Sequence, residues 1–214
     1  MIFMKWLQLK GWELGMKRRS DMRAASLVFS ICLTLFLLVS VQSASGREIA
    51  GVTVPESLTI NNKVLVLNGA GIRKKFIIKV YVGSLYLTVK RSSVMEILDD
   101  PGAKRIVMNF LYKEVSADTL VKGWNEGFAE NNSSQELLPL KDRIRQFNSF
   151  FVTVRKGDEI RLDYLPGEGT QVWINDTLRG SVPGEDFSRA LLKIWLGPNP
   201  PDSNLKEAML GNSY

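Results

Sequence analysis

Arg73 stands out in this sequence because of the residues around it. It follows two glycines, Gly69 and Gly71, and precedes a run of β-branched and aromatic residues. Glycine allows backbone conformations that other residues avoid, so we expect a sharp turn that positions the guanidinium at the start of a strand. A guanidinium stays charged and matches a carboxylate with two parallel hydrogen bonds, so Arg73 indicates a site for an anionic, otherwise apolar ligand. An ion pair with a nearby acid, or simple exposure, is the alternative that sequence alone leaves open.

The strand after Arg73 supplies a second polar group, the hydroxyl of Tyr81. Side chains alternate along a strand, and both faces of this one are mostly apolar, which predicts a central strand covered on two sides. Lys79 and Tyr81 share a face and must reach solvent or find partners. The predicted faces consist of Phe76, Ile78, Val80, Val82 and Tyr86 on one side and Ile77, Lys79, Tyr81, Leu85 and Leu87 on the other.

The composition narrows the possible chemistry. The chain has no histidine, and its one cysteine, Cys32, lies in an apolar N-terminal stretch. This excludes imidazole acid–base catalysis, cysteine nucleophiles, disulfides and His/Cys zinc sites. Acidic residues fall mostly in predicted turns, caps and exposed helix faces, with no pair in an apolar cleft. We therefore expect neither a metal nor a cofactor.

The N-terminus has the pattern of a secretory signal peptide. Four basic residues between positions 17 and 23 precede an uncharged stretch from Ala24 to Gly46 that ends in small residues. We predict a signal peptide at 1–45, with cleavage near Ser43 or Ser45, and export to a periplasm. An uncleaved leader would act as a membrane anchor, the one membrane contact that the sequence predicts.

The leader also accounts for most of the basic charge. Of the net charge of +6, +4 falls in residues 1–45, so the remainder carries only +2. A basic isoelectric point that belongs to a targeting segment gives no reason to expect nucleic-acid binding. The oligomeric state is not specified by the sequence.

The mature part reads as one α+β domain, a mainly antiparallel sheet with helices packed on it. We expect a hairpin at Asn61-Asn62, a helix opened by a capping box at Ser93, an amphipathic helix over 116–130 and another from Pro139. The expected later elements are strands at 104–113, 159–165, 171–174 and 177–182, an amphipathic helix after Gly184 and a short terminal helix.

Several segments together resemble the chalcone isomerase family, in particular its bacterial chalcone isomerase-like branch. They are NGAGIRKKF, KVYVGSLYL, RIVMNFLYKEVSADTLVKGWNEGF, GDEIRLDYLPGEGTQVWIND and PGEDFSRALLKIWLG. The resemblance covers nearly all of 46–214. It implies an open-faced β-sandwich in which a large antiparallel sheet lies under a helical layer, with a cleft between them.

The resemblance also implies roles for particular residues. Arg73 corresponds to the arginine that binds substrate in the plant enzymes, and Asn125 to an asparagine hydrogen bonder. Three positions depart from the catalytic pattern: Tyr81 and Ile194 replace threonines, and Asp118 replaces a tyrosine. Arg73 with Tyr81 instead resembles the carboxylate clamp of the family's fatty-acid-binding members, and loss of the other polar groups removes donors that would stabilise an enolate.

These observations favour a non-catalytic, exported binding protein for a fatty acid or similar apolar carboxylate. The ligand-binding residues expected are Arg73, Tyr81, Asn125 and Ile194; Trp124, Phe128, Ile194 and Trp195 are candidate contacts for the acyl tail, and equally good core residues. The first alternative is an intramolecular lyase that cyclises a phenolic enone, using Arg73 and Asn125. The second is a structural or partner-binding module of the cell envelope.

Overall fold

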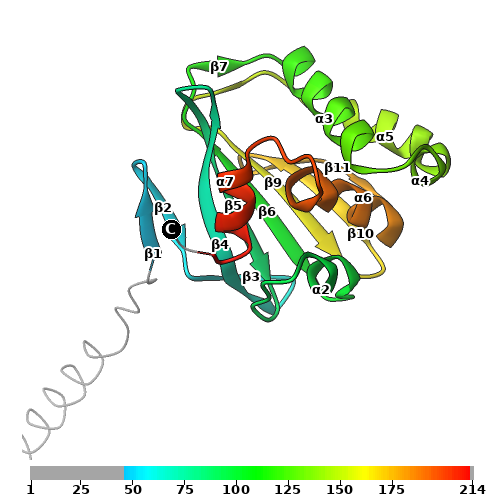
Figure 1. Cartoon of the computed structure of the whole chain (residues 1–214), viewed down its shortest axis with the longest axis horizontal. Coiled ribbons are helices and arrows are strands. Elements are labelled where there is room, and N and C mark those ends of the chain that lie inside the picture. The colour runs from blue at the N-terminus through cyan, green and yellow to red at the C-terminus, as the bar shows by residue number, and fades with distance from the viewer. Residues whose placement is uncertain (1–45, 213–214) are drawn as a thin grey trace, which may run out of the picture. The chain divides into compact units, whose positions relative to one another are not determined.

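The computed structural model describes residues 46–212, so the predicted signal peptide lies outside the described residues. Its main feature is a seven-stranded sheet that is antiparallel throughout (Figure 1), which confirms the predicted α+β class. The strands, in spatial order, are β11 (Thr177–Val182), β10 (Gly169–Ile174), β9 (Glu159–Leu165), β6 (Lys104–Phe110), β5 (Ile78–Leu87), β4 (Lys63–Lys75) and β3 (Ser57–Ile60).

Two small two-stranded sheets and a set of helices complete the fold. β1 (Gly46–Ile49) pairs with β2 (Val52–Pro55), and β7 (Glu114–Val115) pairs with β8 (Val154–Arg155). The helices are α2 (Val94–Asp99), α3 (Ala117–Asn131), α4 (Ser134–Leu137), the 3-10 helix η1 (Leu138–Leu140), α5 (Lys141–Asn148), α6 (Glu185–Leu196) and α7 (Ser203–Met209). None of the helices within 46–212 is long and apolar enough to cross a bilayer.

The sheet is covered on both faces, by helices on one and by the β1–β2 hairpin on the other. On one face, Tyr81, Leu85 and Leu87 of β5 join the apolar side chains of α3, α5, α6 and α7 in the larger core. On the other face, Val82 and Tyr86 belong to a smaller core closed by Ile49 and Val52 of the β1–β2 hairpin. This confirms the predicted faces of these five β5 residues. Val80, which was predicted on the face of Val82 and Tyr86, belongs instead to the larger core.

The glycines before Arg73 lie inside a strand, so the predicted sharp turn at this point is wrong. Gly69 and Gly71 lie within β4 and have no positive φ, and β4 continues to Lys75. The turn comes at Phe76 and Ile77, which the sequence placed in the strand.

The glycines instead let helix α7 approach the sheet closely. A Cβ atom at Gly69 would lie 1.9 Å from the backbone oxygen of Ala208, and one at Gly71 would lie 2.7 Å from the Ala208 Cβ. Gly83 stands opposite Gly71 on β5 and meets Leu205 of α7. The three glycines form a flat surface on which α7 rests, because any larger residue would push the helix away.

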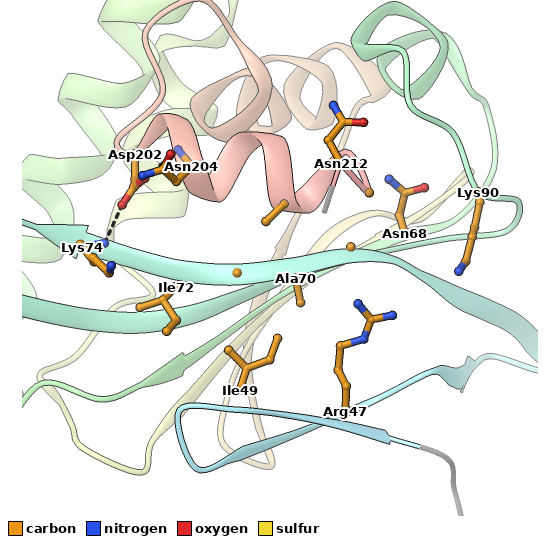
Figure 2. Close-up of a pocket in the computed structure, with 14 residues that line it drawn as sticks. Arg47, Ile49, Asn68, Ala70, Ile72, Lys74, Lys90, Asp202, Asn204 and Asn212 are labelled. Carbon is orange, nitrogen blue, oxygen red and sulfur yellow. Dashed lines mark hydrogen bonds between the residues drawn. The ribbon is translucent and has the colours of Figure 1, made fainter. Parts of the chain in front are cut away.

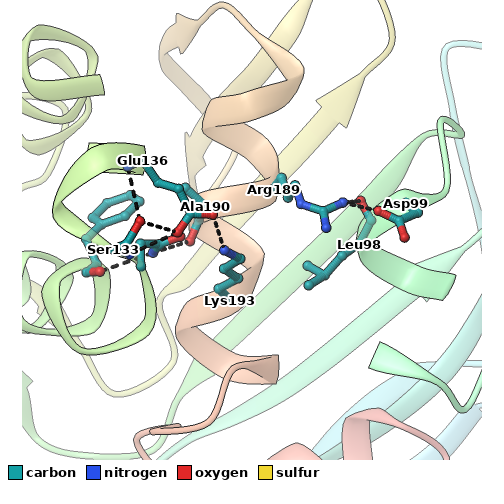
Figure 3. A network of polar contacts seen from close by, with 9 residues as sticks. Leu98, Asp99, Ser133, Glu136, Arg189, Ala190 and Lys193 are labelled. Atoms are coloured by element: carbon teal, nitrogen blue, oxygen red, sulfur yellow. Dashed lines mark hydrogen bonds and ion pairs between the residues drawn. The ribbon is translucent and has the colours of Figure 1, made fainter. Parts of the chain in front are cut away.

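Helix α6 is fixed laterally by polar contacts at both sides (Figure 3). Its Lys193 donates to Glu136 of α4 over 2.6 Å, and its Arg189 contacts Asp99 and the carbonyl oxygen of Leu98 at α2. Ser133 forms the capping box of α4 with the same Glu136. By contrast, Ser93 makes no side-chain cap on α2, so the capping box predicted there is wrong.

The remaining sequence predictions agree with the structure to within a few residues. The Asn61-Asn62 turn connects β3 to β4, as expected. Helix α3 is the helix expected at 116–130, and the three late strands lie at the expected places. The helix expected from Pro139 begins instead as η1 and continues as α5.

Candidate functional site

Arg73 and Tyr81 face each other across two neighbouring strands. They are register partners in the β4–β5 pair, and both lie on the face of the sheet that carries the helices. The guanidinium carbon of Arg73 lies 5.7 Å from the centre of the Tyr81 ring. Cross-strand neighbours on one face are close enough to act on the same group, so the two side chains form a common polar site.

The hydroxyl of Tyr81 is buried and oriented by a tryptophan. Tyr81 is only 4% exposed, and its hydroxyl oxygen accepts a hydrogen bond of 3.0 Å from Nε1 of Trp195 on α6. Burial raises the pKa of Tyr81, an effect that the charge of Arg73 and the bond from Trp195 oppose but do not cancel. The phenol is therefore protonated at neutral pH and retains one proton to donate.

Both groups have donor capacity left over within residues 46–212. No carboxylate of these residues lies within 4 Å of the Arg73 guanidinium, and no acceptor among them is found for the Tyr81 proton. The acid nearest to the site along α7, Asp202, is engaged in accepting from the backbone N–H groups of Lys74, Asn204 and Leu205. The ion-pair alternative to an anion site is thus not formed by the described residues.

Aromatic side chains continue inward from this polar pair. Trp195 packs against Trp124, with ring centres 5.7 Å apart, and Trp124 packs against Phe147 and Phe151. Trp124 is 4% exposed, and its indole N–H has no hydrogen-bond partner in the described chain. A buried donor left without a partner costs free energy, so this indole could satisfy an acceptor brought by another molecule.

Two further residues suggested by the resemblance lie on helices α3 and α6. Asn125 is on the exposed side of α3, where its side-chain oxygen accepts from Asn148 of α5 over 2.8 Å. Ile194 is buried against Gly127 of α3. Ile194 belongs to the same larger core as Tyr81. Asp118, at the position of an enzyme tyrosine, is exposed in the first turn of α3.

A groove of about 670 Å³ runs along the outer edge of β4, outside the Arg73–Tyr81 pair. Strand β3 pairs only with Lys63–Val66, so β4 has no described strand partner beyond Val66 on this side. Figure 2 shows Arg47 and Ile49 of the β1–β2 hairpin on one side of β4 and Asn204 and Asn212 on the other. Sequence reasoning missed this groove because it depends on where β3 ends and where α7 docks.

No cluster of three potential metal-ligating side chains is found in the part of the chain that the structure describes. The Arg73–Tyr81 pair itself offers a guanidinium and a phenol, two groups that can donate hydrogen bonds to an anion.

Comparisons with known proteins agree with this architecture. A family model described as chalcone isomerase-like matches residues 46–211. A fatty-acid binding protein of Arabidopsis thaliana, known from a crystal structure, superposes with a TM-score of 0.63 at 19% sequence identity, covering 78% of this chain and 97% of the plant chain. The search of curated proteins found no match. The fold is thus the expected open-faced β-sandwich with a helical layer, and the chain belongs to the chalcone isomerase-like family.

Proposed function

We propose that the protein binds a fatty acid or a similar apolar carboxylate without transforming it, with the head group at Arg73 and Tyr81. The observation that carries this proposal is the pair of unused donors. Arg73 has no described acid partner, and the Tyr81 hydroxyl, fixed by Trp195, still has a proton to donate. Two donors on neighbouring strands beside an apolar core suit a carboxylate attached to a hydrocarbon.

The chemistry of this pair favours a carboxylate over a neutral group. The guanidinium offers two parallel N–H groups, and hydrogen bonds to charged acceptors are stronger than neutral ones, the more so where water is scarce. The relation in fold to a plant fatty-acid binding protein supports the same ligand class.

The acyl tail would have to enter a region now filled by aromatic side chains. Trp124, Phe128, Ile194 and Trp195 are all at most 4% exposed and belong to the larger core. Protein interiors are close-packed, so a tail displaces side chains rather than filling a void. We therefore propose that ligand binding opens the cluster around Trp124, whose buried indole N–H has no hydrogen-bond partner among the described residues.

Equilibrium binding of oleate tests the proposal. The full chain, freed of bound lipid, should take up oleate, and Arg73→Ala should weaken binding about 10- to 100-fold, the range that loss of a charged hydrogen bond produces. Arg145→Ala is the matched control, because Arg145 is exposed and pairs only with Asp142 one turn away. Equal affinity of the wild type and Arg73→Ala would exclude the clamp.

A second candidate is the partner-binding module, which the groove along β4 favours. An unpaired strand edge accepts an extended peptide as an additional strand. Here the stretch without a strand partner lies between Leu67 and Lys74, whose own backbone N–H groups already donate to Glu56 and Asp202. In that case the protein would show no oleate uptake, and a change in the groove, such as Ala70→Arg, would disrupt partner capture while Arg73→Ala would not. For the lyase alternative, the described structure shows Asn125 exposed, with its side-chain oxygen accepting a hydrogen bond from Asn148.

We also propose that the protein is exported. The basic and apolar pattern of residues 1–45 supports this, and cleavage near Ser43 or Ser45 would release a chain that begins close to β1. Intact-mass measurement of protein recovered from the exported fraction tests both points, since an unprocessed mass or absence from that fraction would contradict them.

A further inference from the structure

The tip of the β4–β5 hairpin, residues Lys74–Lys79, carries exposed apolar side chains. Phe76 is 91% exposed and Ile77 is 93% exposed, the highest values of any large apolar residue within 46–212. Ile78 beside them is also exposed. Single apolar residues on a surface are ordinary, but three consecutive ones at a protruding turn indicate a contact with something apolar.

The backbone conformation of the turn does not favour the residues found in it. Lys75 pairs with Ile78, which leaves a two-residue loop in which Phe76 has φ of 56°. Such loops favour glycine or asparagine at positive φ, and a bulky residue there is uncommon. The turn at the other end of β4, Asn61-Asn62, has φ of 45° and 62° and consists of asparagine, a residue that tolerates positive φ. Phe76 therefore occupies its position at a conformational cost that folding alone does not explain.

The tip is surrounded by positive charge. Lys74, Lys75 and Lys79 are exposed, and none of them pairs with an acid in the described chain. All three lie within three residues of Phe76 or Ile77. An apolar tip with lysines around it is complementary to a surface that has an apolar interior and anionic groups at its boundary with water. The lysine stems can lie along the apolar material while their ammonium groups stay in water, next to the anionic groups.

The neighbouring segment extends this surface. The backbone N–H of Tyr112 donates to Val80 of β5, so the exposed Tyr112 lies at the same end of the molecule, and Lys113 follows it. Figure 1 draws β7, which begins at Glu114, beside the end of the β4–β5 hairpin. Glu114 is neutralised by Arg155, so the cationic character of this end is retained.

We propose that this end of the molecule docks on an anionic lipid bilayer, with Phe76 and Ile77 inserted at the interface and the lysines against lipid head groups. Each lysine near such a surface adds attraction, and the paired apolar side chains add burial. The inference does not rest on fatty-acid binding. If both hold, docking places Arg73 and Tyr81, which flank the tip, next to the lipid from which a fatty acid would be taken.

A fluorophore attached at the tip tests the proposal, because any attachment through the leader is common to the proteins labelled at the tip and at the control site. In the full chain carrying Cys32→Ser, Ile77→Cys is labelled with a nitrobenzoxadiazole dye, and Leu138→Cys serves as the control because Leu138 is a lone exposed apolar residue on η1. The samples are mixed with vesicles of phosphatidylcholine alone or with one part phosphatidylglycerol to two parts phosphatidylcholine.

The proposal predicts a blue shift and stronger emission for the dye at position 77 on anionic vesicles, and no change at position 138. Adding Lys74→Gln, Lys75→Gln and Lys79→Gln should weaken this insertion about tenfold or more. A dye at 77 that stays in water on both kinds of vesicle, or that behaves like the dye at 138, would overturn the proposal and leave a protein pocket as the partner of the tip.

Discussion

The hydroxyl of Tyr81 does two things at once in this structure. It satisfies the buried indole N–H of Trp195, and it keeps its own proton on a ring whose centre lies 5.7 Å from the guanidinium carbon of Arg73. Tyr81→Phe removes the acceptor and leaves the indole unpaired, which should lower the free energy of unfolding by about 1–3 kcal/mol. Urea unfolding measures this loss. Tyr112→Phe, at an exposed tyrosine, is the control and should change little, so equal effects of the two substitutions would contradict the assigned role of Tyr81.

Glu136 gives a pH-dependent prediction of defined sign. The hydrogen bond from Lys193, together with those from Ser133, lowers the pKa of Glu136 to about 2, against roughly 4.3 in an unfolded chain. Because the folded-state pKa is depressed, the stabilisation is complete above about pH 5 and is lost as the pH falls toward about 2. The side chain is 47% exposed, which limits its contribution to at most about 1 kcal/mol.

The expected consequence concerns the variant Glu136→Gln. It should be less stable than wild type by up to about 1 kcal/mol at pH 7, with a difference that shrinks toward zero near pH 2. Denaturant titrations at a series of pH values measure this difference. A gap between the two proteins that stays constant over the whole range would show that the Glu136 carboxylate is not held as described.

For single residues, the sequence predicted which side chains belong to the site better than it predicted the contacts they make. Periodicity placed Tyr81 on the correct face of its strand, and the glycine pattern drew attention to Arg73. Their combination in one site was expected only from the family resemblance. Periodicity could not predict it, because the register depends on a two-residue turn formed by Phe76 and Ile77, neither of which is a typical turn residue. The bond from Trp195 needs the docked position of α6 as well.

At the scale of elements, the contact of α7 with the sheet depends on glycines that have no side chain to hinder it. Gly71→Ala places a Cβ 2.7 Å from that of Ala208, so the helix must shift, which should cost about 1–3 kcal/mol of stability. Thermal or urea unfolding measures the loss.

The control for this substitution is Gly123→Ala. Gly123 lies inside α3, and a Cβ atom added there would meet no neighbouring atom within 4 Å, so alanine should stabilise the helix by about 0.5–1 kcal/mol. If both glycines respond alike, the close approach of α7 is not what requires glycine at position 71.

Helices and strands were predicted well where periodicity is strong, as in α3, α6 and β9. The predicted turn before Arg73 was wrong because glycine has two uses, turning the chain and allowing close packing, and the local sequence does not distinguish them. Ser93 shows the same limit, since a capping-box pattern forms its hydrogen bonds only if the surrounding backbone allows it.

For the described molecule as a whole, the relevant features are the two cores and two surfaces, the exposed tip of the β4–β5 hairpin and the groove along β4. The helix side of the sheet carries the Arg73–Tyr81 pair over an aromatic core, and the hairpin tip extends beyond it at the same end of β4 and β5. The fold class followed from the order of predicted elements and from the family resemblance. The exposed tip and the groove along β4 did not, because exposure and edge pairing are properties of the assembled sheet.

The central claim, that Arg73 and Tyr81 hold a carboxylate, is tested most directly by the carbon-13 resonance of palmitate labelled at its carboxyl carbon and bound to the protein. A carboxylate held by a guanidinium stays ionised to lower pH than a free one, so the bound resonance should titrate at a lower pH in the wild type than in Arg73→Ala. A bound carboxyl carbon that titrates identically in both proteins would contradict the claim.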